Sequence, residues 1–174
     1  KSDVITEQFA RIAKRELQRA GNTVWRHDIV GIADFARPSS LPRFHFVNLE
    51  AGTIKSFLVS HGRGSDPAHS GFLQAFSNVP GSEATSRGAY LTCEWYKGKY
   101  GTSIRLVGMD QDNFTALERA IVMHPAAYAS SEHIAKFGRK SGVSFFPFDH
   151  HRWSTCVVAI ELIGNRTRCP QTAA

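Results

Sequence analysis

Short runs of β-branched and aromatic residues, separated by turn-forming residues, fill much of the chain between residues 28 and 107. Phe44 and Phe46 alternate with His45 and Val47, which is the period of a strand with two different faces. Glu-Ala-Gly-Thr at residues 50–53 is a hairpin signal between two such runs. The patterns predict a mainly β fold, with an antiparallel β-sheet or sandwich core and a few peripheral helices. The predicted strands cover residues 28–35, 43–49, 54–60, 89–96, 103–107 and 119–124.

Helices are predicted at three places. Apolar residues recur near the helical period in residues 2–20, where Ser2 or Asp3 could cap the start and Gly21 the end. Shorter helices are predicted for residues 113–120 and 130–136.

The length and composition fit one globular domain. The chain has 174 residues, of which 42% are hydrophobic, and two domains of that total size would be cramped. We expect a helix within residues 1–22 that packs on a single domain formed by residues 23–174. No run of about 18 apolar residues is present, which excludes a transmembrane helix. The chain begins at Lys1 without a methionine, so we expect a processed form whose targeting segment has been removed.

The net charge of +6 suits an anionic partner such as nucleic acid, a membrane surface or an acidic cell-wall polymer. The densest basic stretch, residues 11–19, is typical of a solvated helix face, and no nucleic-acid-binding motif accompanies it. We therefore expect no nucleic-acid partner. The spacing of Cys93, Cys156 and Cys169 fits no zinc pattern, so no metal site is predicted, and a Cys156–Cys169 disulfide stays open.

Three segments carry groups suited to chemistry. Residues 60–65 (Ser-His-Gly-Arg-Gly-Ser) open a loop rich in Gly, Ser, Asn and Pro, and offer a proton-transfer group and a carboxylate clamp. An apolar run ends at His124, a common position for a catalytic base. Residues 138–144 form a Gly/Ser-rich turn that could present a nucleophile and backbone donors for an oxyanion.

Seven segments, in this order, resemble the catalytic domain of the bacterial murein L,D-transpeptidases, in the branch that carries Ser-His-Gly-Arg-Gly-Ser. They are residues 34–39, 60–66, 76–82, 88–92, 96–101, 105–110 and 119–124. The resemblance covers most of residues 28–141 and fades beyond about residue 144.

The resemblance implies a β-rich fold in which a cysteine attacks a peptide carbonyl and forms an acyl-enzyme. The acyl donor is a peptidoglycan stem peptide, cut after its diamino acid, and the acceptor is the amine of a second stem. A periplasmic or cell-envelope location is implied, and no cofactor or metal. His124 matches the histidine that activates the thiol. The substrate-binding residues that we expect are His61, Gly62, Arg63, Ser65, Arg139, Ser141 and Gly142.

The chain departs from the family at the nucleophile. The family motif after the histidine runs Arg, Ser, any residue, Gly, Cys, and the cysteine position falls on Val143 or Ser144, depending on the anchor. Cys156 lies in residues 155–160, a run typical of a buried strand, which argues against its being a displaced nucleophile.

Three explanations stay open. Ser144 could be the nucleophile, natively or as a replacement of cysteine, with His124 as its base. The chain could be an inactive relative that binds peptidoglycan without cutting it. The end of the chain could also be translated from a shifted reading frame after Gly142.

Overall fold

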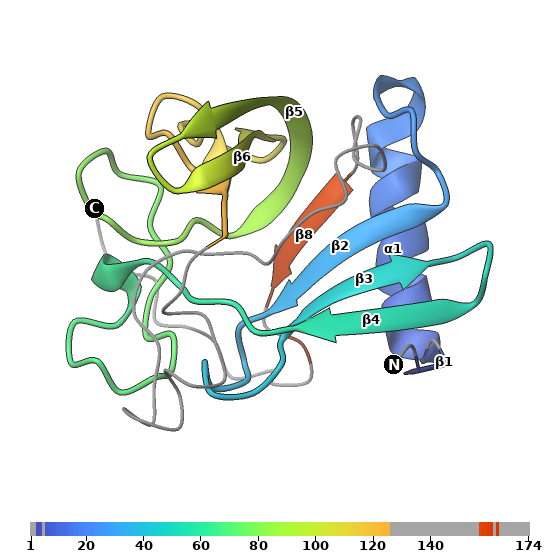
Figure 1. Ribbon diagram of the computed structural model, residues 1–174, viewed down its shortest axis with the longest axis horizontal. Coiled ribbons are helices and arrows are strands. Elements are labelled where there is room, and N and C mark those ends of the chain that lie inside the picture. The colour runs from blue at the N-terminus through green and yellow to red at the C-terminus, as the bar shows by residue number, and fades with distance from the viewer. Residues whose placement is uncertain (1–2, 5, 126–156, 162, 164–174) are drawn as a thin grey trace.

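A computed structural model describes residues 3–4, 6–125, 157–161 and 163. In these residues eight strands form one sheet in the order β1-β4-β3-β2-β8-β5-β6-β7, which confirms a mainly β fold. One α-helix, α1 (Glu7–Ala20), lies against this sheet (Figure 1). The strands are β1 (Asp3–Val4), β2 (Ile29–Asp34), β3 (Phe44–Asn48), β4 (Thr53–Phe57), β5 (Gly88–Gly98), β6 (Gly101–Gly108), β7 (Val122–Met123) and β8 (Val157–Glu161), and three 3-10 turns are η1 (Gly21–Thr23), η2 (Arg63–Ser65) and η3 (Gln111–Asn113).

The sheet is mixed, so the expected antiparallel core is confirmed in part: every described strand pair is antiparallel except that of β2 and β8. β8 lies between β2 and β5 and runs parallel to β2, while it is antiparallel to β5. Residues 157–160 are all buried, as the apolar run predicts. A strand that is covered on both faces has a continuous apolar sequence. Such a sequence does not indicate whether the neighbouring strands run parallel or antiparallel to it.

Two apolar cores cover the two faces of the central strands. On one face, Ile12 and Leu17 of α1 pack with Val30, Ile32 and Val47. On the other face, Phe44 and Tyr90 pack with residues of β6 and β7. The alternation in β3 is confirmed, because Phe44 and Phe46 belong to the second core, whereas Val47 and the His45 ring, 4.6 Å from that of Phe9, face α1.

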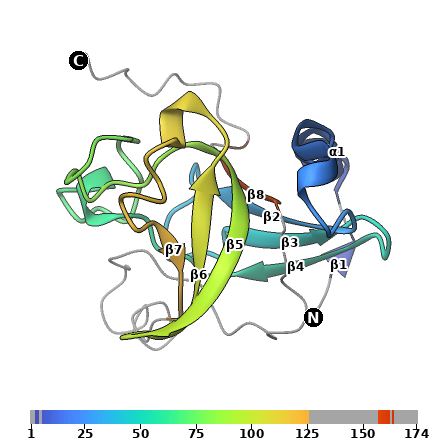
Figure 2. The same cartoon turned by 90° about the horizontal axis from the view of Figure 1, so that it is seen from above.

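β5 joins the two parts of the sheet. Its first residues pair with β8, and the strand from Tyr90 onward pairs with β6, with a register shift between Thr92 and Trp95. Such irregularities bend a strand. Figure 2 shows β5 arching away from β8, so that β6 and β7 stand apart from the flat region of β2, β3 and β4. Residues of β5 and β6 line the pocket described below.

The helix boundaries differ from the prediction at the start. α1 begins after Thr6, whose hydroxyl accepts a hydrogen bond from the Phe9 backbone N–H, because Asp3 and Val4 are already paired with β4. It ends at Gly21, as predicted, where the backbone has a φ of 54°. No helix in the described part of the chain is long and apolar enough to cross a membrane.

The helix predicted for residues 113–120 is wrong. The chain forms η3 and then a series of turns that close with backbone hydrogen bonds from Ala116 to Asn113 and from Ala120 to Leu117. The Asn113 side chain donates to the Ala89 carbonyl, and the Thr115 hydroxyl bonds to residue 78. These side chains bind neighbouring segments instead of supporting a helix. The helix predicted for residues 130–136 lies outside the described residues.

Candidate functional site

A pocket of about 400 Å³ lies between the β5–β6 hairpin and the loop that precedes β5. Its walls are partly aromatic, and His124 stands in one of them at the end of β7. The residues that line it are Phe35, Ser60, Glu83, Ala84, Thr85, Tyr96, Gly98, Lys99, Tyr100, Ser103, Leu106, Arg119, Ala120, Ile121, Val122, His124 and Ile160.

His124 is buried, and Pro125 and Tyr100 are among the neighbours that orient it. Its Nδ1 lies 2.9 Å from the Pro125 carbonyl oxygen, and the Tyr100 ring stacks on its imidazole at a centroid distance of 4.7 Å. A carbonyl oxygen only accepts hydrogen bonds, so a neutral His124 carries its proton on Nδ1. Nε2 is then the nitrogen that can accept a proton, which is the arrangement of a general base.

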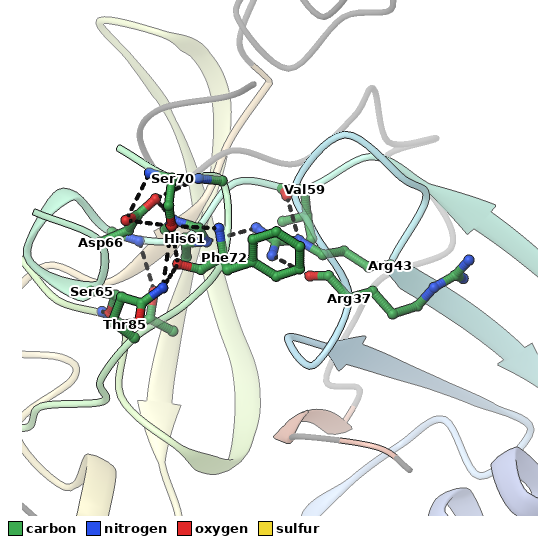
Figure 3. Close-up of polar contacts among 12 residues, drawn as sticks. Arg37, Arg43, Val59, His61, Ser65, Asp66, Ser70, Phe72 and Thr85 are labelled. Carbon is green, nitrogen blue, oxygen red and sulfur yellow. Dashed lines mark hydrogen bonds and ion pairs between the residues drawn. The ribbon is translucent and has the colours of Figure 1, made fainter. Parts of the chain in front are cut away.

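His61 is buried in a polar network with Arg43 and Asp66 (Figure 3). Its Nδ1 lies 2.9 Å from Nη2 of Arg43, and its Nε2 lies 3.4 Å from a carboxylate oxygen of Asp66. Arginine can only donate, so Nδ1 accepts and the ring proton is on Nε2, facing Asp66. His61 is therefore held in the opposite tautomer to His124, and it does not line the pocket.

Burial governs the ionisation of this network. Burial, and then the charge of Arg43, lower the pKa of His61 to about 4. Burial also lowers the pKa of Arg43 to about 9, against the attraction of Asp34 and Asp66. Burial opposes the ionisation of Asp66, but hydrogen bonds from Ser70 and Gly71 outweigh it and lower the pKa of that carboxyl. His61 thus stays neutral near pH 7 and acts as a hydrogen-bonding link.

The two glycines of residues 60–65 allow a close approach to residues 82–85. A Cβ on Gly62 would stand 2.3 Å from the Glu83 carbonyl oxygen, and one on Gly64 would stand 1.8 Å from that of Ser82. The buried Ser65 hydroxyl accepts a hydrogen bond of 2.9 Å from the Thr85 backbone N–H. Gly62, Gly64 and Ser65 therefore support the pocket wall from behind.

Arg63 contacts the same wall on its outer side. Its guanidinium is largely exposed and pairs with Glu83, with Nε 2.8 Å from the carboxylate. Glu83 lines the pocket, whereas Arg63 does not. Ser60 is the residue of this segment that reaches the pocket.

Arg119 holds the wall from its inner side. Its guanidinium donates to the carbonyl oxygens of Ser77 and Ala84, at 2.8 and 2.6 Å, and to the hydroxyls of Ser82 and Ser86. Burial lowers the pKa of Arg119. Through these four hydrogen bonds, the Arg119 side chain holds residues 77–86 in place.

The remaining predicted site residues lie outside the described part of the chain. These are Arg139, Ser141, Gly142 and Ser144, together with Val143 and the cysteines Cys156 and Cys169. Among the residues that the structure describes, no group of three His, Cys, Asp or Glu side chains could hold a metal ion.

The prediction missed the β5–β6 turn as part of the site. Tyr96, Lys99 and Tyr100 line the pocket, and Tyr100 orients His124. These residues belong to a segment, 96–101, that resembles the family, which was the available signal. What the sequence did not show is that the hairpin bends over the histidine.

One of the comparisons with known proteins identifies a family. A family model described as the L,D-transpeptidase catalytic domain matches residues 1–147. No curated protein and no solved structure gives a significant match. The matched residues make up most of the chain and contain the whole described pocket except Ile160. The chain therefore belongs to the L,D-transpeptidase catalytic domain family.

Proposed function

We propose that this protein acts on peptidoglycan stem peptides in the cell envelope, by acyl transfer or hydrolysis, with His124 as general base. The observation that carries the proposal is the geometry of His124. Its Nδ1 is held by the Pro125 carbonyl and its ring by Tyr100, so Nε2 is the proton acceptor in a pocket large enough for part of a peptide.

The chemistry follows from that tautomer. A hydroxyl or thiol beside Nε2 would lose its proton to His124 as its oxygen or sulfur attacks the carbonyl of the stem peptide. The leaving amine would then take the proton from Nε2, and an acyl-enzyme would remain. Water or the amine of a second stem would release the acyl group by the reverse steps.

We propose Ser144 as the nucleophile in this chain, on the family motif alone. Arg139, Ser141 and Gly142 are proposed to bind substrate around it. We further propose that Gly62, Arg63 and Ser65 serve the substrate indirectly, by setting the wall formed by residues 82–85, and that His61 does so by binding Arg43 and Asp66. The hydrogen bonds and close approaches of residues 62–65 to that wall support this role.

The second candidate function is peptidoglycan binding without cleavage. It is favoured by the motif itself, because neither Val143 nor Ser144 supplies a thiol. A serine hydroxyl is far less acidic than a thiol, so His124 without a strong orienting carboxylate would activate it poorly. The binding surface would be the same in both cases.

Restoring the thiol tests the proposal. We expect that Val143→Cys or Ser144→Cys, made one at a time, forms a covalent adduct with a carbapenem-type β-lactam, detected by mass spectrometry of the intact protein. His124→Ala in the reactive background should abolish the adduct, because the thiol loses its proton acceptor and returns towards a pKa of about 8.5. The unchanged chain is the control.

Two results would count against the proposal. Folded cysteine variants that do not react would show that no acylation site is assembled around His124. Reaction that persists at full rate in the His124→Ala background would remove the histidine from the mechanism. Rapid cleavage of a stem tetrapeptide by the unchanged chain, lost in Ser144→Ala, would reject the binding-only function.

A further inference from the structure

Three charged side chains, those of Glu83, Lys99 and Arg119, line the pocket, and two of them are already bound to other groups of the protein. Glu83 pairs with Arg63, and Arg119 donates to four oxygen atoms of residues 77–86. Lys99 is the third. In the part of the chain that the structure describes, no carboxylate pairs with Lys99.

Lys99 lies at the turn between β5 and β6, on the rim of the pocket. Its Nζ is 5.5 Å from the centroid of the Tyr100 ring, which in turn stacks on His124. The ammonium group is therefore one aromatic ring away from the imidazole of the base. An anion held by Lys99 would therefore lie beside the ring that stacks on His124.

We propose that Lys99 binds the C-terminal carboxylate of the stem peptide, on the residue that leaves during acylation. This inference rests on the proposed function. In a stem that is cut before its last residue, the free carboxylate is separated from the scissile nitrogen by a single carbon atom. Because His124 delivers a proton to that nitrogen, a cation one ring away from His124 is placed to hold this carboxylate.

Aromatic residues of the pocket lie beside Lys99. Tyr96 and Tyr100 line the same part of the pocket, and the Lys99 side chain itself is exposed to solvent. A charge-assisted hydrogen bond is stronger than a neutral one, and at an exposed ammonium its contribution is modest. Lys99 would then select stems with a free C-terminal carboxylate over stems amidated there.

Binding to the unchanged chain, measured by calorimetry, tests the inference without requiring turnover. The probe is a synthetic stem tetrapeptide with a free C-terminus, compared with the same peptide amidated at its C-terminus and with one amidated at the diamino acid carboxylate. We expect Lys99→Met to raise the Kd of the free-carboxylate peptide about 3- to 10-fold, and added salt to raise it in the unchanged chain.

The controls separate this inference from the proposed function. Lys97→Met removes a charge from the same hairpin at a position outside the pocket lining and should leave the Kd unchanged. The C-terminal amide should bind weakly to both the unchanged chain and Lys99→Met, with equal Kd. If instead the peptide amidated at the diamino acid binds weakly and with equal Kd to the unchanged chain and to Lys99→Met, Lys99 binds the diamino acid carboxylate and the inference is overturned.

Failure has two distinct forms. If the three peptides bind the unchanged chain and Lys99→Met alters none of the affinities, Lys99 is not a carboxylate site, while the proposed function stands. If no stem peptide binds at all, but the protein is folded, the proposed function fails and the inference fails with it.

Discussion

Gly64 lies so near to residue 82 that its lack of a side chain is a structural requirement. Its N–H donates to the Glu83 carbonyl at 3.0 Å, and a Cβ would overlap the Ser82 carbonyl oxygen. We expect Gly64→Ala to lower the free energy of unfolding by about 3 kcal/mol, since the two segments must part and lose hydrogen bonds. Urea denaturation measures the loss.

Gly52→Ala provides the matched control for this prediction. Gly52 has a φ of +63° and open space around it, so alanine there costs only the strain of a left-handed backbone, about 1 kcal/mol. If the two variants lose equal stability, the close approach of residues 62–65 to the pocket wall is not what Gly64 provides.

At the residue scale, family resemblance identified side chains but not the direction in which they face. His61 and Arg63 are separated only by Gly62 in the sequence, yet His61 is buried with Arg43 while Arg63 pairs with Glu83 at the surface. Their positions depend on residues 43, 66 and 83, which are distant in the sequence. Such a long-range network has no local pattern from which it could be predicted.

The element that most directly shapes the pocket is the loop of residues 77–86, which contains no strand or helix. A loop without its own ladder of hydrogen bonds must be held by side chains, and Arg119 supplies four bonds to it. We expect Arg119→Lys to cost about 2 kcal/mol of stability, because an ammonium cannot reach both carbonyls and both hydroxyls in the same plane.

The readout for this prediction is local as well as global. Amide hydrogen exchange of residues 77–86 should accelerate in Arg119→Lys more than exchange in β2 or β8. Arg87→Lys, at an exposed position next to the same loop, is the control and should change neither stability nor exchange. Unchanged exchange in residues 77–86 of Arg119→Lys would contradict the proposal that Arg119 holds this loop in place.

Elements with a strong local period were predicted correctly, and those decided by tertiary contacts were not. The β3–β4 hairpin and the end of α1 at Gly21 follow from turn and capping residues. Residues 113–120 carry a helical pattern, but Asn113 and Thr115 bond to Ala89 and Asn78 instead. The sequence does not show that these partners lie nearby, so it cannot show that the helix is replaced by turns.

On the scale of the whole molecule, the last described strand completes the fold. β8 occupies the centre of the sheet, between β2 and β5, and Val157 and Val158 contribute to the two cores on opposite faces. Its burial was predictable from its apolar run, whereas its neighbours and its direction were not. The pocket depends on this placement, because β5 pairs with β8 at its start and Ile160 of β8 lines the pocket.

The stability of the whole molecule should fall as the pH decreases from about 6.5 towards 4. Burial lowers the pKa of His45 and of His61 to about 4, from the value of 6.5 that a histidine has when exposed. In the unfolded chain both would take up protons below pH 6.5, whereas in the folded chain they resist until about pH 4. Proton uptake therefore favours unfolding, and the stability that is complete above pH 6.5 is lost progressively below it.

The expected loss in the free energy of unfolding across this pH range is of order 3 kcal/mol for each histidine. Asp34 reduces the total, because burial raises the pKa of its carboxyl and this carboxyl therefore changes stability in the opposite sense. Urea denaturation at half-unit steps of pH from 4 to 7.5 measures the slope. His61→Asn should flatten the profile by about half, because its amide oxygen can still accept from Arg43 but no longer titrates. The exposed His27→Asn should leave the slope unchanged. A stability that does not change with pH across this range in the unchanged chain would mean that the two rings are already protonated or reached by water in the folded protein. Neutral His61 could then no longer be taken to link Arg43 to Asp66.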